Sequence, residues 1–154
     1  MRGALRGVLV VALALSVIAA TGCGGDTKAK NEYVTAVNKA QSDFVAVVDD
    51  SESRIGGDAS DQDTAQQLDA IRQAAADVVV ELRGVKPPAS ARTLHMSLVR
   101  EAEGLVAAFK KAADAYRSGT PSRILTAKVQ LKKDITGVNR QLNATIHALN
   151  EKLS

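Results

Sequence analysis

Apolar residues recur at steps of three and four along four separate stretches of this 154-residue chain, and this helical periodicity constrains the fold more than any other feature. The most regular stretch runs from Leu131 to Leu149, with a spacing typical of a seam between packed helices. No run alternates apolar and polar residues over a length that would favour a sheet. The positions expected to face the core are Tyr33, Val37, Ala40, Phe44, Val47, Val48, Leu68, Ile71, Ala75, Val78, Val79, Leu82, Leu94, Leu98, Ala102, Leu105, Phe109, Ala112, Tyr116, Leu131, Ile135, Val138, Leu142, Thr145 and Leu149.

Segments that stop helices separate the four stretches. The glycine pair in IGGDASDQD ends the first stretch, and Ser60 or Asp61 is expected to cap the second. The proline pair in VKPP ends the second, because proline removes a backbone donor and biases the preceding residue away from helical geometry. SGTPS ends the third, with Gly119 as terminator, Thr120 as cap and Pro121 at the first helical position.

These short connections predict an all-α fold. Helices of similar length joined by short loops pack as antiparallel neighbours, so we predict an up-down-up-down four-helix bundle over residues 31–154. The two phenylalanines test this topology. The first and third helices are expected to start near Thr27 and Ser90. At 1.5 Å of rise per residue, Phe44 and Phe109 then lie at levels along the bundle axis that differ by only about 3 Å. They are therefore expected to share one core layer.

The first 22 residues read as a basic start, MRGALRG, then an apolar stretch from Val8 to Ala20, then small residues before Cys23. About thirteen apolar residues suit the core of a signal peptide, whereas a membrane-spanning helix needs roughly twenty. The sequence ATGC, which ends at Cys23, resembles the lipobox of bacterial lipoproteins, with Ala20 at the position where leucine is most common. The resemblance implies cleavage before Cys23, diacylglyceryl attachment to its sulfur, and acylation of the new amino terminus.

Cys23 is the only cysteine in the chain, which fits this interpretation. A single cysteine in an exported protein cannot form an internal disulfide and would otherwise be a reactive thiol. We therefore expect a lipoprotein signal peptide over residues 1–22, a flexible tether over residues 23–30, and a protein lipid-anchored to the extracytoplasmic side of the cell membrane. Secretion after cleavage without lipid and an uncleaved anchor are the alternatives.

The composition limits the core and the partners. Only 3% of residues are aromatic and there is no Trp, so Ala, Val, Leu and Ile must fill the interior, which favours close helix packing over a large pocket. Two of the 20 basic residues, Arg2 and Arg6, lie in the leader, which leaves 18 against 17 acidic residues, or +1, for the rest. Nucleic acid is not expected as a partner, because its phosphates require a dense basic face.

No stretch has a known catalytic pattern. A glycine-rich phosphate loop, GxSxG, HExxH and paired cysteines are all absent from the sequence. Ser, Asp and His occur, but as scattered residues without a third group to orient them. We therefore predict that the protein is not an enzyme, and we predict no catalytic residues, no metal ligands and no cofactor.

Two clusters of opposite charge fall toward the same end of the predicted bundle. Residues 43–63 hold seven acidic residues and one basic residue, or −6, and residues 110–133 hold seven basic residues and one acidic residue, or +6. Either the clusters neutralise each other across the surface, each exposed pair contributing about 1 kcal/mol or less, or they form a recognition surface for a partner. The acidic cluster lacks the ordered ligand positions of a calcium loop.

The two histidines are expected near each other at the opposite end. Antiparallel pairing of the third and fourth helices would bring His95 and His147 less than a turn apart. Each directly follows an apolar core position, so we predict half-exposed histidines at helix edges. The alternative is a transition-metal site with Met96 or Glu151, although stable sites usually have three or four ligands.

Residues 85–109, VKPPASARTLHMSLVREAEGLVAAF, resemble a loose pattern of small helical lipoproteins of actinobacteria: a proline pair, small residues, Leu-His and an apolar helix. Most of those proteins have no known function, so the resemblance implies an envelope location and a bundle but no reaction. We expect a non-catalytic interaction module of the cell envelope that docks to an envelope protein. A carrier or sensor of a small apolar ligand between the helices is the alternative, and a cavity on the order of several hundred Å³ would favour it.

Overall fold

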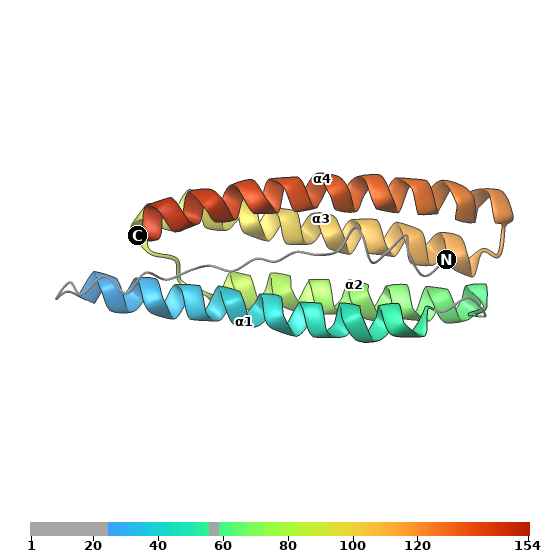
Figure 1. Cartoon of the computed structure of the whole chain (residues 1–154), viewed down its shortest axis with the longest axis horizontal. Helices are drawn as coiled ribbons and strands as arrows, with labels where there is room; N and C mark the ends of the chain where they lie inside the picture. Colours follow the sequence, from blue (N-terminus) through green and yellow to red (C-terminus); the bar gives the residue numbers. More distant parts are fainter. Residues whose placement is uncertain (1–24, 56–58) are drawn as a thin grey trace.

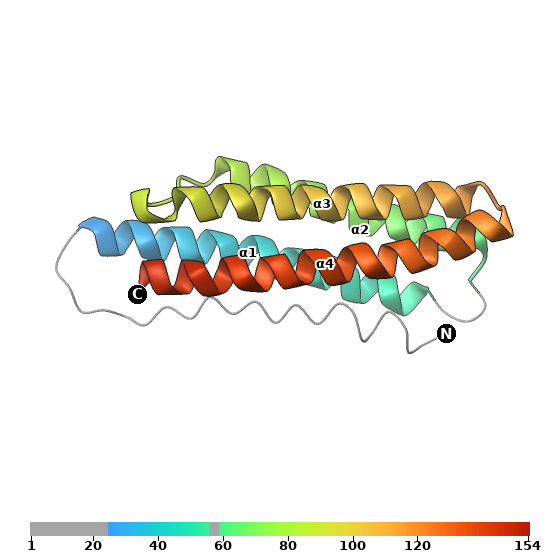
Figure 2. The ribbon, with the colours of Figure 1, turned by 90° about the horizontal axis from the view of Figure 1, so that it is seen from above.

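A computed structural model describes residues 25–55 and 59–154, and in these ranges the protein is an up-down-up-down four-helix bundle, as predicted. The four long helices run back and forth along one axis, and Figures 1 and 2 show that the start of α1 and the end of α4 lie at the same end. The elements are α1 (Gly25–Arg54), α2 (Asp61–Gly84), the short 3₁₀ helix η1 (Ala89–Ala91), α3 (Arg92–Arg117) and α4 (Pro121–Leu153).

Helix α1 begins at Gly25, inside the segment that we predicted to be a flexible tether, so that prediction is wrong for residues 25–30. No proline or further glycine interrupts the chain between Gly25 and the amphipathic part of the helix. Lys28 and Glu32 form an ion pair of 3.7 Å one turn apart, which adds local support. Residues 1–24, including the predicted signal peptide and Cys23, lie outside the described residues.

The ends of the helices follow the local signals in the sequence. Ser60 caps α2 in a capping box with Asp63, in which the Ser60 hydroxyl accepts from the Asp63 backbone at 3.1 Å. Gly119 adopts φ +59° after α3, a left-handed conformation that glycine takes readily, and Pro121 begins α4. Thr120 occupies the cap position, but its hydroxyl donates to the carbonyl of Ser118 and makes no capping bond.

One apolar core runs the length of the bundle. Of the predicted core positions, most are buried, and Val47, Val78, Leu94, Tyr116, Leu131 and Val138 are partly buried at its edges. Small alanines allow the helices to approach closely, as the composition predicted. Ile146, the core position before His147, is buried as expected, and the core also includes positions that were not predicted: Val34, Ala65, Ala91, Ala108, Ala113 and Ile124.

Contacts between helices fix the levels along the bundle axis. The rings of Tyr33 and His95 lie 5.6 Å apart between their centroids, so these residues define one level on α1 and α3. Phe44 stands eleven residues farther along α1, and Phe109 fourteen residues farther along α3. At 1.5 Å per residue the two phenylalanine levels differ by about 4.5 Å. Both rings are buried in the same core cluster, which fits the predicted layer.

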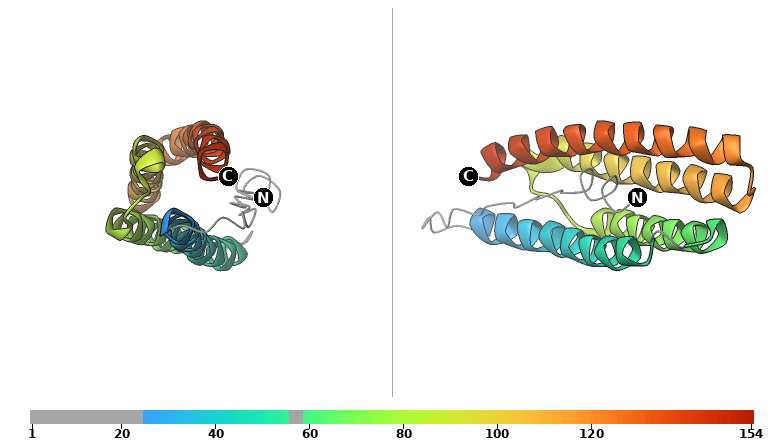
Figure 3. Two further views of the ribbon diagram at one scale, coloured as in Figure 1. Left: turned by 90° about the vertical axis from the view of Figure 1, so that its left-hand side faces the viewer. Right: turned by 45° about the vertical axis from the view of Figure 1, so that its right-hand side comes forward.

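The ring of four helices is not closed equally on all sides. The sequential neighbours α1–α2, α2–α3 and α3–α4 pack closely, whereas α1 and α4 stay farther apart. The end-on view in Figure 3 shows this open side between the blue α1 and the red α4.

Candidate functional site

Helices α3 and α4 pack along a line of small residues, and a long shallow groove runs over this contact on the surface. A methyl group added at Gly104 would lie 3.4 Å from the Val138 side chain, which shows how closely the two helices approach. The groove consists of two adjoining hollows of about 490 and 710 Å³ that share Ala108, Lys111 and Asp134. Its lining includes the small residues Gly104, Ala107, Ala108, Ala112, Ala115, Ala127 and Gly137.

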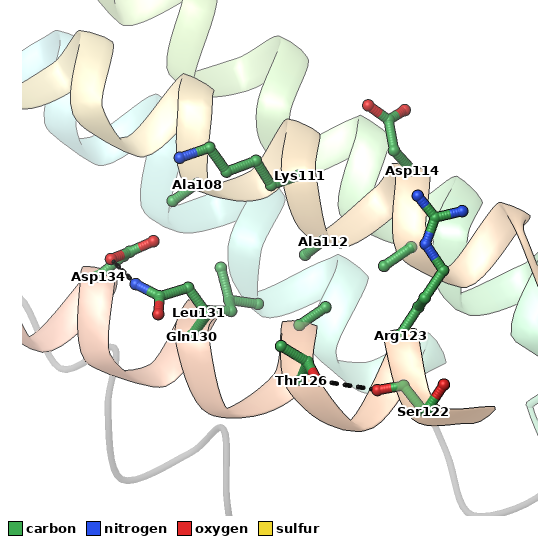
Figure 4. Close-up of a pocket in the computed structure, with 12 residues that line it drawn as sticks. Ala108, Lys111, Ala112, Asp114, Ser122, Arg123, Thr126, Gln130, Leu131 and Asp134 are labelled. Carbon is green, nitrogen blue, oxygen red and sulfur yellow. Dashed lines mark hydrogen bonds between the residues drawn. The ribbon is translucent and has the colours of Figure 1, made fainter. Parts of the chain in front are cut away.

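Five basic side chains line this surface, which we call the basic groove: Lys111 on α3, and Arg123, Lys132, Lys133 and Arg140 on α4. Figure 4 shows Lys111 and Arg123 projecting from the two helices along one of the hollows. All five side chains are exposed. In the part of the chain that the structure describes, none of the five forms an ion pair. Their positive charge is therefore available to a partner.

The carboxylates near the basic groove already have partners. Asp114 accepts from Lys110 at 2.7 Å and from Arg117 at 2.8 Å, and Arg117 also pairs with Asp69 of α2. Asp134 accepts a hydrogen bond from the amide of Gln130 at 2.6 Å. These local contacts leave the net potential of the groove positive.

The acidic cluster of residues 43–63 is arranged differently from the basic one. Asp43 pairs with Lys39, and Asp50 with Arg54, each one turn away on α1. Asp63 belongs to the cap of α2. Asp43 and Asp50 are thus matched by cations of their own helix, and no such contact links either of them to α4 in the described residues. The recognition-surface alternative therefore suits the basic cluster better than mutual neutralisation does.

The prediction for His95 is wrong: its side chain is buried in the core, with 7% of its surface exposed. Its Nδ1 lies 3.2 Å from the Tyr33 hydroxyl on α1. Burial lowers the pKa of His95, and a hydrogen bond to the backbone carbonyl of Leu82 partly opposes that shift. With one ring nitrogen donating to that carbonyl, Nδ1 is the acceptor for the hydroxyl. Burial also raises the pKa of Tyr33 to about 12.

His147 points away from this buried pair. Its side chain is 77% exposed, and its Nδ1 lies 3.6 Å from a carboxylate oxygen of Glu151 on the same helix. The structure therefore does not combine His95 and His147 into one site. Within residues 25–55 and 59–154, no group of three or more His, Cys, Asp or Glu side chains is placed to hold a metal ion.

A second polar contact lies between α3 and α4. The Thr145 hydroxyl donates to Oε1 of Glu101 at 2.8 Å, while Oε2 of the same carboxylate is buried without a hydrogen-bond partner. Burial raises the pKa of Glu101, and the bond from Thr145 and the nearby Arg100 oppose that rise. A partly desolvated carboxylate of this kind costs stability when it is ionised.

The interior hollow is small. Side chains of all four helices surround a space of about 70 Å³ in the middle of the bundle. Sites for drug-sized ligands usually measure about 300–1,000 Å³. The volume falls below the range that would favour a carrier of an apolar ligand, so the surface groove is the better candidate site.

Comparison with known proteins returns no match to the chain, whether to a family model, to a curated protein or to a solved structure. In the described part of the chain, no helix combines the length and the apolar character that crossing a membrane requires.

Proposed function

We propose that this protein is a lipid-anchored, extracytoplasmic interaction module, and that its basic groove docks an acidic segment of an envelope protein. The observation that supports the docking surface is the set of five exposed cations without carboxylate partners along the contact between α3 and α4. Complementary charge speeds association and selects partners. The small residues of the lining leave room for a partner backbone to approach.

The anchor is supported by the sequence around Cys23. The lipobox resemblance implies that the mature chain begins at Cys23, and α1 begins two residues later at Gly25. The bundle would then start next to the membrane, with the α1–α2 and α3–α4 turns at its far end. Intact mass after extraction from membranes should correspond to a chain that starts at Cys23 and carries acyl groups. An unmodified thiol would contradict the anchor, and Cys23→Ser should release the protein from the membrane.

A defined acidic probe tests the docking surface without knowledge of the natural partner. The chain from residue 23 onward, with Cys23→Ser, is titrated into fluorescent poly-glutamate of about 20 residues at low salt, and anisotropy gives the Kd. Neutralising the groove by Lys111→Gln, Lys133→Gln and Arg140→Gln should weaken binding by about tenfold or more, since three charge contacts are lost.

The matched control removes equal charge elsewhere. Lys28, Lys86 and Lys152 are exposed and line neither hollow of the groove, so Lys28→Gln, Lys86→Gln and Lys152→Gln together should change the Kd by less than about threefold. Equal losses in the two triple variants would mean that binding follows net charge alone and that the groove has no special role.

A further inference from the structure

The open side between α1 and α4 reaches into the core. These are the two helices of the ring that do not pack closely, and the interior hollow lies behind the gap. Its lining includes the partly exposed Gln41 and Val45 of α1 and Asn139 of α4. We call this surface the α1–α4 seam and include in it exposed residues beside these positions, Asp49 of α1 and Leu125, Val129 and Lys132 of α4. Val129 and Lys132 also line one hollow of the basic groove.

The levels of the residues along the two edges of the seam can be matched. Tyr33 lies beside His95, and Glu101, six residues beyond His95, bonds to Thr145. Lys39, six residues beyond Tyr33 on α1, therefore stands level with Thr145 of α4 along the bundle axis. Because the helices are antiparallel, Val45 stands level with the residue six before Thr145, which is Asn139.

The same count brings opposite charges to nearly one level. Asp49 stands level with Ile135, three residues or about 4.5 Å from Lys132. Asp49 shares a face with Val45, four residues before it, and Lys132 shares a face with Asn139, two turns after it. In the described residues neither Asp49 nor Lys132 forms an ion pair.

The α4 edge also exposes large apolar side chains. Leu125 and Val129 are 65% and 66% exposed, and both lie on the face of α4 that presents Lys132. Exposed apolar side chains that are bordered by charged residues are typical of a protein–protein contact, which has an apolar centre and a polar rim. An occupant of the seam must therefore offer both apolar surface and a carboxylate at the level of Lys132.

We propose that this occupant is a second copy of the chain, related by a two-fold axis parallel to the bundle. That operation brings α1 of each copy against α4 of the other at an unchanged level, so Asp49 of each copy meets Lys132 of the other. It also keeps the start of α1 in both copies at the same end, as attachment to one membrane requires. Lys132 also lines the basic groove, but the inference does not require that an acidic segment docks there.

A charge swap tests the proposed pairing. The unlipidated chain from residue 23, with Cys23→Ser, should show twice the monomer mass by light scattering at high concentration. Asp49→Lys and Lys132→Asp should each weaken self-association by about tenfold or more, because like charges then meet twice in each dimer. An equal mixture of the two variants should recover the dimer, because both contacts become oppositely charged again. Both residues are exposed, so the variants should retain the circular dichroism of the parent.

Disulfide formation between two single-cysteine chains tests the geometry. Cys23→Ser removes the only natural cysteine, so a mixture of Val45→Cys and Asn139→Cys chains should form a mixed disulfide across the seam. Gln66→Cys and Arg100→Cys, on α2 and α3, should not. A monomer at all concentrations, a dimer indifferent to the charge swap, or equal crosslinking of the control pair would overturn the proposal.

Discussion

Truncating Phe109 removes the most deeply buried aromatic ring of the bundle, since this side chain has 0% of its surface exposed. Phe109→Ala deletes about 100 Å³ of side chain, and at about 24 cal/mol per Å³ of residual cavity an unrelaxed core loses about 2.4 kcal/mol. The lost transfer of the ring from water adds about 2 kcal/mol. We therefore expect the free energy of unfolding to fall by about 3–5 kcal/mol, a large part of the stability of a domain of this size.

Urea titration of the unlipidated Cys23→Ser chain, followed by circular dichroism at 222 nm, measures this loss. The same measurement on Phe44→Ala and on the double variant tests the shared layer. If the two rings interact, the double variant should deviate from additivity by at least about 0.5 kcal/mol. A loss below about 1 kcal/mol for Phe109→Ala would refute the burial argument. Strict additivity would place the rings in separate layers.

Three further predictions concern single groups. Because the folded state lowers the pKa of His95 below its ordinary value of 6.5, the unfolded chain binds more protons near that pH. Its contribution to stability should be complete above pH 6.5 and decrease as the pH falls through the folded pKa, and His95→Gln should reduce this dependence in urea titrations from pH 8 to 5. The pKa of Glu101 is raised, so this carboxyl makes the protein less stable as the pH rises, which is opposite to the effect of His95. Glu101→Gln should therefore gain stability relative to the parent as the pH rises from 4.5 to 7. Gly119→Ala should cost about 1 kcal/mol in the same assay, because alanine is strained at φ +59°.

The bundle could be predicted from the sequence because the signals that define it are local. The periodicity around Leu142 fixes which face of α4 is buried, and Ser60 and Gly119 mark ends through their own backbone preferences. Residues 25–30 were predicted to belong to a tether, because a polar segment without apolar periodicity resembles one although nothing in it opposes a helix.

The interior position of His95 depends on a residue far away in the sequence. His95 lies one turn before Leu98 and so shares its buried face, which is a signal that the sequence contains. The polar partner that makes this burial acceptable is Tyr33, 62 residues earlier, and only the tertiary structure identifies it. The basic groove is similar. Its charge was visible as a cluster, but the pairing of Lys110 and Arg117 with Asp114 determines which cations remain for a partner.

Amide chemical shifts of the ¹⁵N-labelled unlipidated chain during addition of poly-glutamate test the docking surface, since they locate the bound probe on the protein. The largest shifts should fall on residues 104–115 of α3 and 122–141 of α4, around the basic groove, and the Lys111, Lys133 and Arg140 neutralisations should reduce them at equal probe concentration. Shifts of equal size on the outer faces of α1 and α2, or none at saturating probe, would contradict the docking surface.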